Sequence, residues 1–303
     1  MELTLITFNK TIVMAILALI GAFCFKRKII NKEQNSALSD LVLRVFTPVL
    51  LFTSFQKEYS SELLQGLLFS ALFSFMSFFV IWLILKAVVH KQPKDTASIE
   101  LVSLMYSNCG FIGIPMAQSL FGSDGIMYMT TMVAVANFLL WSHGIIAVSG
   151  QSDPKAIAKV FKSPVILAIV FGILCFFFRI EIPSLIEEPL ELIANVNTPM
   201  AMFVAGVNIA QSNILKTFKN KRIYWLSLIK LVIIPVAIAV LFTIIPMNAT
   251  VKAVMVLSAA CPVGVTGSLF ALKFNKDACY ASELFAMTTI LSIITIPLIM
   301  MLC

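Results

Sequence analysis

The sequence predicts an all-α membrane protein whose ten transmembrane helices form two inverted five-helix repeats. Three observations favour this fold: an apolar composition, basic residues gathered in alternate loops, and two apolar spans interrupted by glycine and proline. Hydrophobic residues make up 60% of the chain and charged residues only 12%. Soluble domains are about half apolar and about a quarter charged, so this composition indicates a chain that lies in a lipid bilayer.

Ten apolar stretches are each close to the ~20 residues that a helix needs to cross the hydrocarbon core. The loops between them are short and leave no room for a separate soluble domain. We expect helices near residues 6–25, 36–56, 62–88, 97–120, 124–148, 161–179, 185–211, 222–245, 249–273 and 277–302.

The basic residues fall mainly in the loops that follow every second span, which predicts the orientation of the chain. These loops hold 16 of them, namely Lys26, Arg27, Lys28, Lys32, Lys86, Lys91, Lys94, Lys155, Lys159, Lys162, Lys216, Lys219, Lys221, Arg222, Lys273 and Lys276. The opposite side holds four, namely Lys10, Lys57, Arg179 and Lys252. Because cytoplasmic loops carry the excess of Lys and Arg, we expect a protein of the cell membrane with both termini on the extracytoplasmic side. The net charge of +7 then reflects topology, and nucleic acid is not an expected partner.

Two of the spans are interrupted near their middle, one in each half of the chain. The interruptions are residues 108–115 (NCGFIGIP) and residues 261–268 (CPVGVTGS). Unwound backbone does not occur against lipid, so it must line a cavity or be buried in protein. A pair of interrupted spans in corresponding positions is the sequence signature of a transport site near the bilayer midplane.

Three short matches at nearly one offset indicate an internal repeat. The pair TP occurs at 47–48 and 198–199, the triplet SLF at 119–121 and 268–270, and an aspartate opens the next span at Asp124 and Asp277. We therefore expect two homologous halves, residues 1–150 and 151–303. Each half has five spans, and because five is odd the second half enters the membrane inverted, which creates two faces for alternating access.

The two breaks predict an anion site. A helix start carries about half a positive charge and several unpaired backbone N–H groups, so two starts that converge attract an anion. We expect substrate contacts from Asn108, Gly110, Gly113, Pro115, Pro262, Gly264, Val265 and Thr266, and from Asn195 and Pro199 on the seventh span. The alternative is that proline and glycine merely kink packed helices, as is common in membranes.

Four charged residues within spans are candidates for coupling or gating. Asp40 and Arg44 are four residues apart on one helix face, so they form either a structural pair or a gate. Lys230 either extends toward the interface or acts as a counter-charge for the substrate. Glu283 is a candidate proton carrier, because intramembrane carboxylates mark such relays; the alternative is a buried pair with Lys230 or another neighbour.

The motif at 108–115, the two Thr-Pro spans and the break at Pro262 resemble the auxin efflux carrier family, which includes plant auxin exporters and bacterial proteins described as malate permeases. The resemblance covers essentially the whole chain. It implies crossed, broken fourth and ninth helices, as in the bile-acid symporter and sodium–proton antiporter folds. It also implies a scaffold of helices 1, 2, 6 and 7, a moving transport unit of helices 3–5 and 8–10, a homodimer, and an elevator-like motion. Unlike in plant members, the link after the fifth span is short, near 150–160.

The sequence therefore predicts a secondary transporter of small organic anions, with malate-like carboxylates as the leading substrates. No phosphate loop, no zinc-spaced ligand cluster and no GxSxG elbow occurs in it, so we expect no enzyme, no cofactor and no bound metal. Two alternatives stay open: a sodium-coupled symporter of a larger amphipathic anion, and a binding or sensor protein that keeps the fold without transport.

Overall fold

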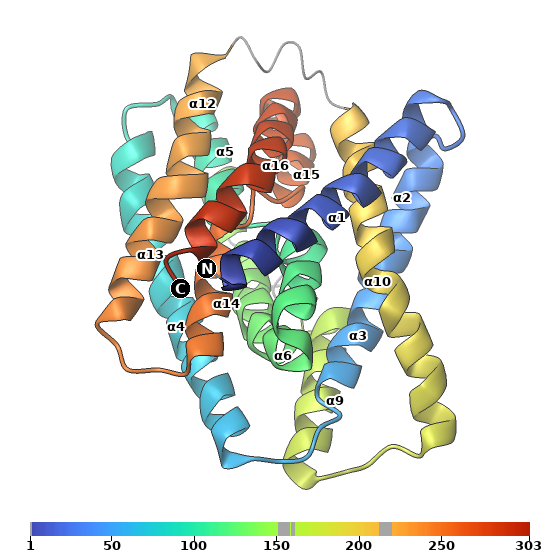
Figure 1. Cartoon of the computed structure of the whole chain (residues 1–303). Helices are drawn as coiled ribbons and strands as arrows, with labels where there is room; N and C mark the ends of the chain where they lie inside the picture. Colours follow the sequence, from blue (N-terminus) through green and yellow to red (C-terminus); the bar gives the residue numbers. More distant parts are fainter. Residues whose placement is uncertain (1, 151–157, 159–160, 212–219) are drawn as a thin grey trace.

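The computed structural model describes residues 2–150, 158, 161–211 and 220–303 (Figure 1). Within these ranges every regular element is a helix, and one isolated bridge pairs Ser107 with Val263. Lys155, Lys159, Lys216 and Lys219 of the predicted basic loops lie outside the described residues, as does most of the link at 150–160.

Seven helices of the described chain are long and apolar enough to cross a membrane, which makes this a multi-pass membrane protein by length and composition. They are Leu5–Lys26, Lys32–Ser54, Ser61–Val89, Cys109–Ser149, Ser184–Gln211, Lys221–Thr243 and Ala278–Met300. Two shorter apolar helices cover Pro164–Phe178 and Ala249–Ala260.

Most helices follow the expected ranges to within a few residues, but helical structure runs from Cys109 to Ser149 through the gap expected between 120 and 124. The first half contains α1 (Glu2–Lys26), α2 (Lys32–Leu41), η1 (Val42–Phe46), α3 (Thr47–Ser54), α4 (Ser61–Val89), α5 (Lys94–Met105), η2 (Cys109–Gly113), α6 (Ile114–Leu139), η3 (Leu140–Gly144) and α7 (Ile145–Ser149). The second half contains α9 (Pro164–Phe178), α10 (Ser184–Gln211), α12 (Lys221–Leu228), η4 (Ile229–Ile233), α13 (Ile234–Thr243), α14 (Ala249–Ala260), α15 (Thr266–Lys273) and α16 (Ala278–Met300). Inside α6 the chain turns at Gly122, whose φ of +61° suits glycine.

Polar side chains begin several of the helices. Asn31 and Gln34 form a capping box at α2, and the Ser60 hydroxyl accepts from the Leu63 N–H at α4. Ser163 caps α9 directly before Pro164. Proline suits the first helical position, because the N–H that it lacks would have no partner within the helix. These caps satisfy backbone N–H groups that the helix itself leaves unpaired.

Three wide, π-helical turns each precede a proline by two residues. The segments η1, η2 and η4 are followed by Pro48, Pro115 and Pro235. A proline has no N–H, so a regular helix would leave one carbonyl without its donor. In each wide turn the residue before the proline donates to the carbonyl five residues back, for example Ile234 N–H to Ile229 O. The wide turn therefore keeps the backbone paired where water is absent.

The helices pack as two groups (Figure 1). In the first group α1 crosses α10, and α3 packs against α9 and α10. In the second group α4 packs on α5, α6 and α14, while α16 packs on α12, α14 and α15. The groups meet where α1 contacts α6 and α16, α3 contacts α6, and α10 contacts η2.

Two glycines allow α1 and α10 to approach closely. A Cβ added to Gly21 would lie 2.1 Å from the Phe203 carbonyl oxygen, and one added to Gly206 would lie 1.8 Å from the Ala18 carbonyl oxygen. Both obstacles are backbone atoms and have no rotamer to change. Small residues at such crossings bring two membrane helices into backbone contact.

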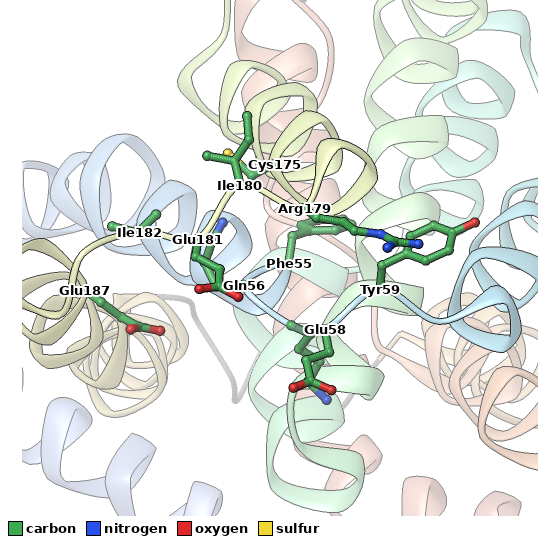
Figure 2. A pocket seen from close by; sticks show the side chains of 11 residues that line it. Phe55, Gln56, Glu58, Tyr59, Cys175, Arg179, Ile180, Glu181, Ile182 and Glu187 are labelled. Atoms are coloured by element: carbon green, nitrogen blue, oxygen red, sulfur yellow. The ribbon is translucent and has the colours of Figure 1, made fainter.

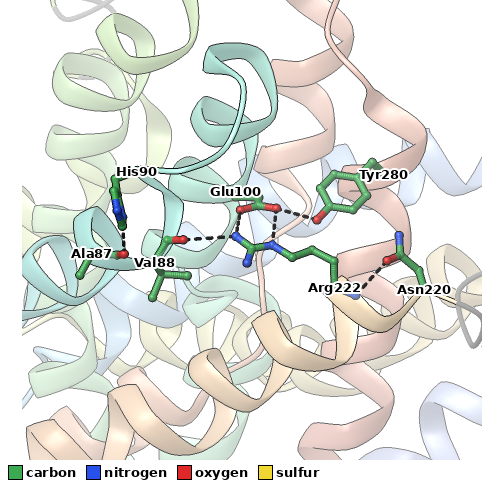
Figure 3. Close-up of polar contacts among 7 residues, drawn as sticks. All are labelled: Ala87, Val88, His90, Glu100, Asn220, Arg222 and Tyr280. Atoms are coloured by element: carbon green, nitrogen blue, oxygen red, sulfur yellow. Dashed lines mark hydrogen bonds and ion pairs between the residues drawn. The ribbon is translucent and has the colours of Figure 1, made fainter.

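A buried carboxylate links four helices of the second group (Figure 3). Glu100 on α5 is fully buried and accepts from Arg222 on α12, with N–O distances of 3.0 and 2.6 Å. Its Oε1 also accepts from the Tyr280 hydroxyl on α16 at 2.8 Å, and Arg222 donates to the Val88 carbonyl of α4 at 3.4 Å. A bidentate Arg–carboxylate pair of this kind is strong and geometrically specific.

We expect Gly206→Ala to lower the thermal stability of the purified protein, because the new methyl group meets the Ala18 carbonyl. The loss should reach the upper end of the about 1–3 kcal/mol typical of overpacking, measured as a lower unfolding midpoint in detergent. Gly110→Ala is the matched control and should unfold like the wild type, since nothing lies within 4 Å of a Cβ there. Equal midpoints for both variants would contradict the close crossing.

We expect Arg222→Met to destabilise the protein by about 3–5 kcal/mol, because Glu100 is then left buried without its charged partner. The double variant Glu100→Leu/Arg222→Met removes both charges and should recover most of that loss. Denaturant unfolding of the two variants measures this coupling. If the double variant is the less stable of the two, Glu100 is not held mainly by Arg222.

Candidate functional site

The two predicted breaks lie against each other in the structure. The Asn108 N–H donates to the Pro262 carbonyl at 2.8 Å, and the Gly264 N–H donates to the Tyr106 carbonyl at 3.2 Å. Between these bonds Ser107 and Val263 form an antiparallel bridge. Each break thus satisfies backbone groups of the other, which a bilayer requires because no water is present to do so. We call the paired segments 106–109 and 261–264 the crossing.

Helix starts and helix ends both meet at the crossing. The first break separates the end of α5 from the start of η2, and the second separates the end of α14 from the start of α15. Starts carry partial positive charge and ends carry partial negative charge. The crossing therefore needs a further cation if it is to favour an anion.

Lys230 supplies a positive charge at this point. It belongs to η4, is completely buried, and donates from Nζ to Ser107 Oγ at 2.5 Å and to the Ala259 carbonyl at 3.3 Å. Ala259 is in the last turn of α14, where a cation offsets the negative helix end. None of the ion pairs among the described residues involves Lys230, so its charge is not neutralised by a carboxylate there.

Asn108 contributes a buried donor. It caps η2 through Oδ1, which accepts from the Phe111 N–H at 3.4 Å. Its Nδ2 is buried and has no hydrogen-bond partner within the described part of the chain. A buried donor without a partner costs about 1–3 kcal/mol, so this amide is suited to receive a ligand oxygen.

The other residues predicted to line the breaks have different surroundings. Around Gly110 there is open space, whereas a Cβ on Gly113 would lie 3.2 Å from Cys109 Cβ and 3.3 Å from Cys261 Sγ. Of the remaining predicted residues, Pro115, Pro262 and Gly264 are buried, and Val265 and Thr266 are partly exposed at the start of α15.

Residues 195–199 of α10 differ in their surroundings. Asn195 and Pro199 are exposed. Their neighbours face inward: Asn197 Oδ1 accepts from Thr47 Oγ1 at 2.7 Å, and Thr198 Oγ1 donates to Gln118 Oε1 on α6 at 2.8 Å.

The remaining charged candidates have other partners than the two hydrogen bonds of Lys230. Asp40 and Arg44 form a pair at 3.5 Å, with 60% and 70% of their side chains exposed. Glu283 is buried on α16, where Oε1 accepts from the Cys279 thiol at 3.8 Å.

Several residues of this region were not predicted from the sequence. Ser107 and Tyr106 stand directly before the predicted motif, and Ser107 proves to be a partner of Lys230. Glu100 lies within the expected span 97–120. Like Glu283 it is a carboxylate in an apolar stretch, and this feature could have identified it as a candidate. Its partner Arg222 was assigned to a basic loop, and nothing in the sequence pairs the two.

A separate cavity of about 520 Å³ lies between the 55–59 and 179–187 segments (Figure 2). Carboxylates and cations both line it, and its cations are engaged: Arg179 lies 4.9 Å above the Tyr59 ring, and Lys57 pairs with Asp124. No residue of the crossing lines this cavity. Its mixed charge is less suited to an anion than Lys230 and Asn108 are.

Among the described residues no group of three or more His, Cys, Asp or Glu side chains forms a metal site. The crossing brings together hydrogen-bond donors, helix termini and one lysine.

The chain resembles transporters along nearly all of its length. An uncharacterized transporter of Methanocaldococcus jannaschii is 23% identical, over 97% of this chain and 98% of that protein. An uncharacterized transporter of Escherichia coli, YfdV, is 22% identical over 93% of each chain. Auxin efflux carrier component 1 of Arabidopsis thaliana is 25% identical over 45% of this chain and 23% of its own length.

A family profile gives the assignment directly. The profile described as "membrane transport protein" matches residues 6–157 and 148–300. Since these two matches extend over almost the whole sequence and the relatives include an auxin efflux carrier, the chain belongs to the membrane transport protein family, that of the auxin efflux carriers.

Proposed function

We propose that the protein transports small organic anions, malate-like carboxylates in particular, and binds the carboxylate at the crossing. The observation that carries the proposal is the buried ammonium of Lys230, which has no carboxylate partner among the described residues. An intramembrane cation of this kind marks a substrate or ion pathway. The unpaired Asn108 amide and the two helix starts add donors beside it.

The electrostatics favour an anion over a neutral ligand. Two helix starts and two helix ends meet at the crossing, so their partial charges roughly cancel and Lys230 leaves it with a net positive charge. A carboxylate has two acceptor oxygens and matches these donors, and charge-assisted hydrogen bonds are about twice as strong as neutral ones.

The proposed mechanism is alternating access between two inverted repeats, residues 1–150 and 151–303, which together make ten spans. The scaffold comprises α1, α2–α3, α9 and α10, and the transport unit comprises α4–α7 and α12–α16. The two packing groups support this division. We also propose a homodimer, an elevator-like motion and outward-facing termini, on the family resemblance and on the loop charges.

Among the described residues, the polar contacts that connect the proposed units include two that must open during the motion. Thr198 on α10 donates to Gln118 on α6 at 2.8 Å. Lys57, after α3, forms an ion pair with Asp124 beyond the turn at Gly122. Such exposed or partly exposed contacts are worth about 1 kcal/mol or less each, so they do not prevent the motion.

The sodium-coupled alternative has less support at the crossing. Two carbonyls of the breaks, those of Tyr106 and Pro262, already accept hydrogen bonds from the opposite break. Uptake in proteoliposomes with sodium and proton gradients varied independently separates these coupling modes. A protein that binds carboxylates in that assay but never moves them would be a sensor.

We expect Asn108→Ala to raise the KM for malate uptake into proteoliposomes about 10- to 100-fold, since a hydrogen bond to a charged group is worth about 1.5–3 kcal/mol. Lys230→Gln, which removes the charge and keeps a donor, should lower uptake further. The matched control is Asn137→Ala, because the Asn137 amide only donates to Val133 O on its own helix. Unchanged uptake in folded Asn108→Ala and Lys230→Gln protein would remove the crossing as the binding site.

Gly110→Leu tests the open space beside the break. Nothing lies within 4 Å of a Cβ at Gly110, so the side chain should fill ligand space without straining the fold. We expect carboxylate uptake to be lost while the thermal unfolding midpoint stays at the wild-type value. Full uptake by this variant would mean that the substrate does not pass Gly110.

A further inference from the structure

Each of the two breaks carries one buried cysteine. Cys109 is the first residue of η2 and is 3% exposed, and Cys261 directly follows α14 and is fully buried. Both are free thiols. The proposed transport mechanism gives them no role.

The pairing of the breaks brings these cysteines opposite each other. The bonds Asn108 N–H to Pro262 O and Gly264 N–H to Tyr106 O flank the Ser107–Val263 bridge. This is the pattern of a non-hydrogen-bonded antiparallel pair, in which the Cα atoms are about 4.5 Å apart. Cys109 follows Ser107 by two residues and Cys261 precedes Val263 by two, so the antiparallel pairing brings both cysteines to the same end of the bridge.

The side-chain contacts agree with this placement. The Cys109 thiol donates to the Ser258 carbonyl at 3.7 Å, three residues before Cys261. Both cysteines border Gly113, where an added Cβ would lie 3.2 Å from Cys109 Cβ and 3.3 Å from Cys261 Sγ. A disulfide needs Cα atoms about 4.4–6.8 Å apart, so the proposal requires the paired breaks to hold the two cysteines within this range.

We propose that Cys109 and Cys261 are a redox site, and that a peroxide joins them in a reversible disulfide that weakens carboxylate binding at the crossing. This regulation rests on the proposed transport function, whereas formation of the disulfide itself does not.

The chemistry balances with hydrogen peroxide as the oxidant. One thiol, as its thiolate, attacks a peroxide oxygen and becomes a sulfenic acid, and the first water leaves. The sulfur of the second thiol then displaces the sulfenic hydroxyl, which leaves as the second water when the thiol proton joins it. Two electrons pass from the two sulfurs to the peroxide. Lys230 donates to Ser107, two residues before Cys109, and to Ala259, two residues before Cys261. Its positive charge favours the attacking thiolate.

The bond would act on the binding site through its immediate neighbours. Asn108 precedes Cys109 and Pro262 follows Cys261, so these residues move when the sulfurs close to the ~2.05 Å of a disulfide. The Asn108 cap on η2 and its buried amide are then displaced from the positions that suit a carboxylate. The breaks also become covalently joined, which reduces their local motion.

The test uses the full chain with the other cysteines, Cys24, Cys175, Cys279 and Cys303, replaced by serine. After treatment with hydrogen peroxide and removal of excess by catalase, the protein is denatured and alkylated, and its mass is measured. We expect the loss of two hydrogen atoms, no alkylated thiol, and recovery of two alkylated thiols after dithiothreitol. A peptide map should link Cys109 to Cys261, and amide hydrogen exchange at the crossing should become slower.

Transport is measured on the same samples in proteoliposomes, beside a matched variant that also carries Cys109→Ser. We expect peroxide to lower malate uptake only when both cysteines are present, with recovery after dithiothreitol. Two thiols that stay alkylatable after peroxide would overturn the redox site. Equal sensitivity of the Cys109→Ser variant would overturn the regulation. A disulfide that forms in a protein without carboxylate uptake would support the redox site and refute the proposed function.

Discussion

The backbone pairing between the two breaks is the constraint on which the rest of the structure depends. Interrupting a helix inside a bilayer exposes N–H and C=O groups that no water can satisfy, and each such bond is worth about 4–6 kcal/mol in an apolar medium. One break alone would leave these groups unpaired. Because Asn108 bonds to Pro262 and Gly264 bonds to Tyr106, each interruption makes the other possible, and the two form one structural unit.

The same pairing decides the electrostatics. The sequence hypothesis considered only the two helix starts, but any break that creates a start also creates an end, and the partial charges of the two are opposite. Lys230 adds a full positive charge to these opposed partial charges. It contacts Ser107 in one break and Ala259 shortly before the other. The wide turn η4 that contains Lys230 precedes Pro235. Pro235 lies outside the crossing, but it determines the wide turn of the helix that carries Lys230.

Helix positions and the two breaks could be predicted because hydropathy, caps, glycine and proline act locally along the chain. The face of each helix that points inward could not be predicted. Lipid-facing and core-facing residues are both apolar in a bilayer, so the sequence carries little periodic signal. On α10 the inward hydrogen bonds come from Asn197 and Thr198, whereas Asn195 and Pro199 are exposed and remain predicted substrate contacts. Long-range pairs such as Glu100 with Arg222 depend on the packing of separate helices and have no local signature.

The contacts within each helix group are stronger than the polar contacts between the two groups. This difference is compatible with the proposed motion of one group against the other. Within the first group the backbones of α1 and α10 touch at Gly21 and Gly206. Within the second a fully buried carboxylate, Glu100, joins several helices. Between the groups the polar links of the described residues include Thr198–Gln118 and Lys57–Asp124, each of modest strength because hydrogen bonds between membrane helices average about 0.6 kcal/mol. Apolar side chains find apolar partners at either position, so the apolar part of the interface opposes the proposed motion only weakly. The crossing lies in the group with the buried Glu100 network, and in the proposed mechanism it moves together with its ligand.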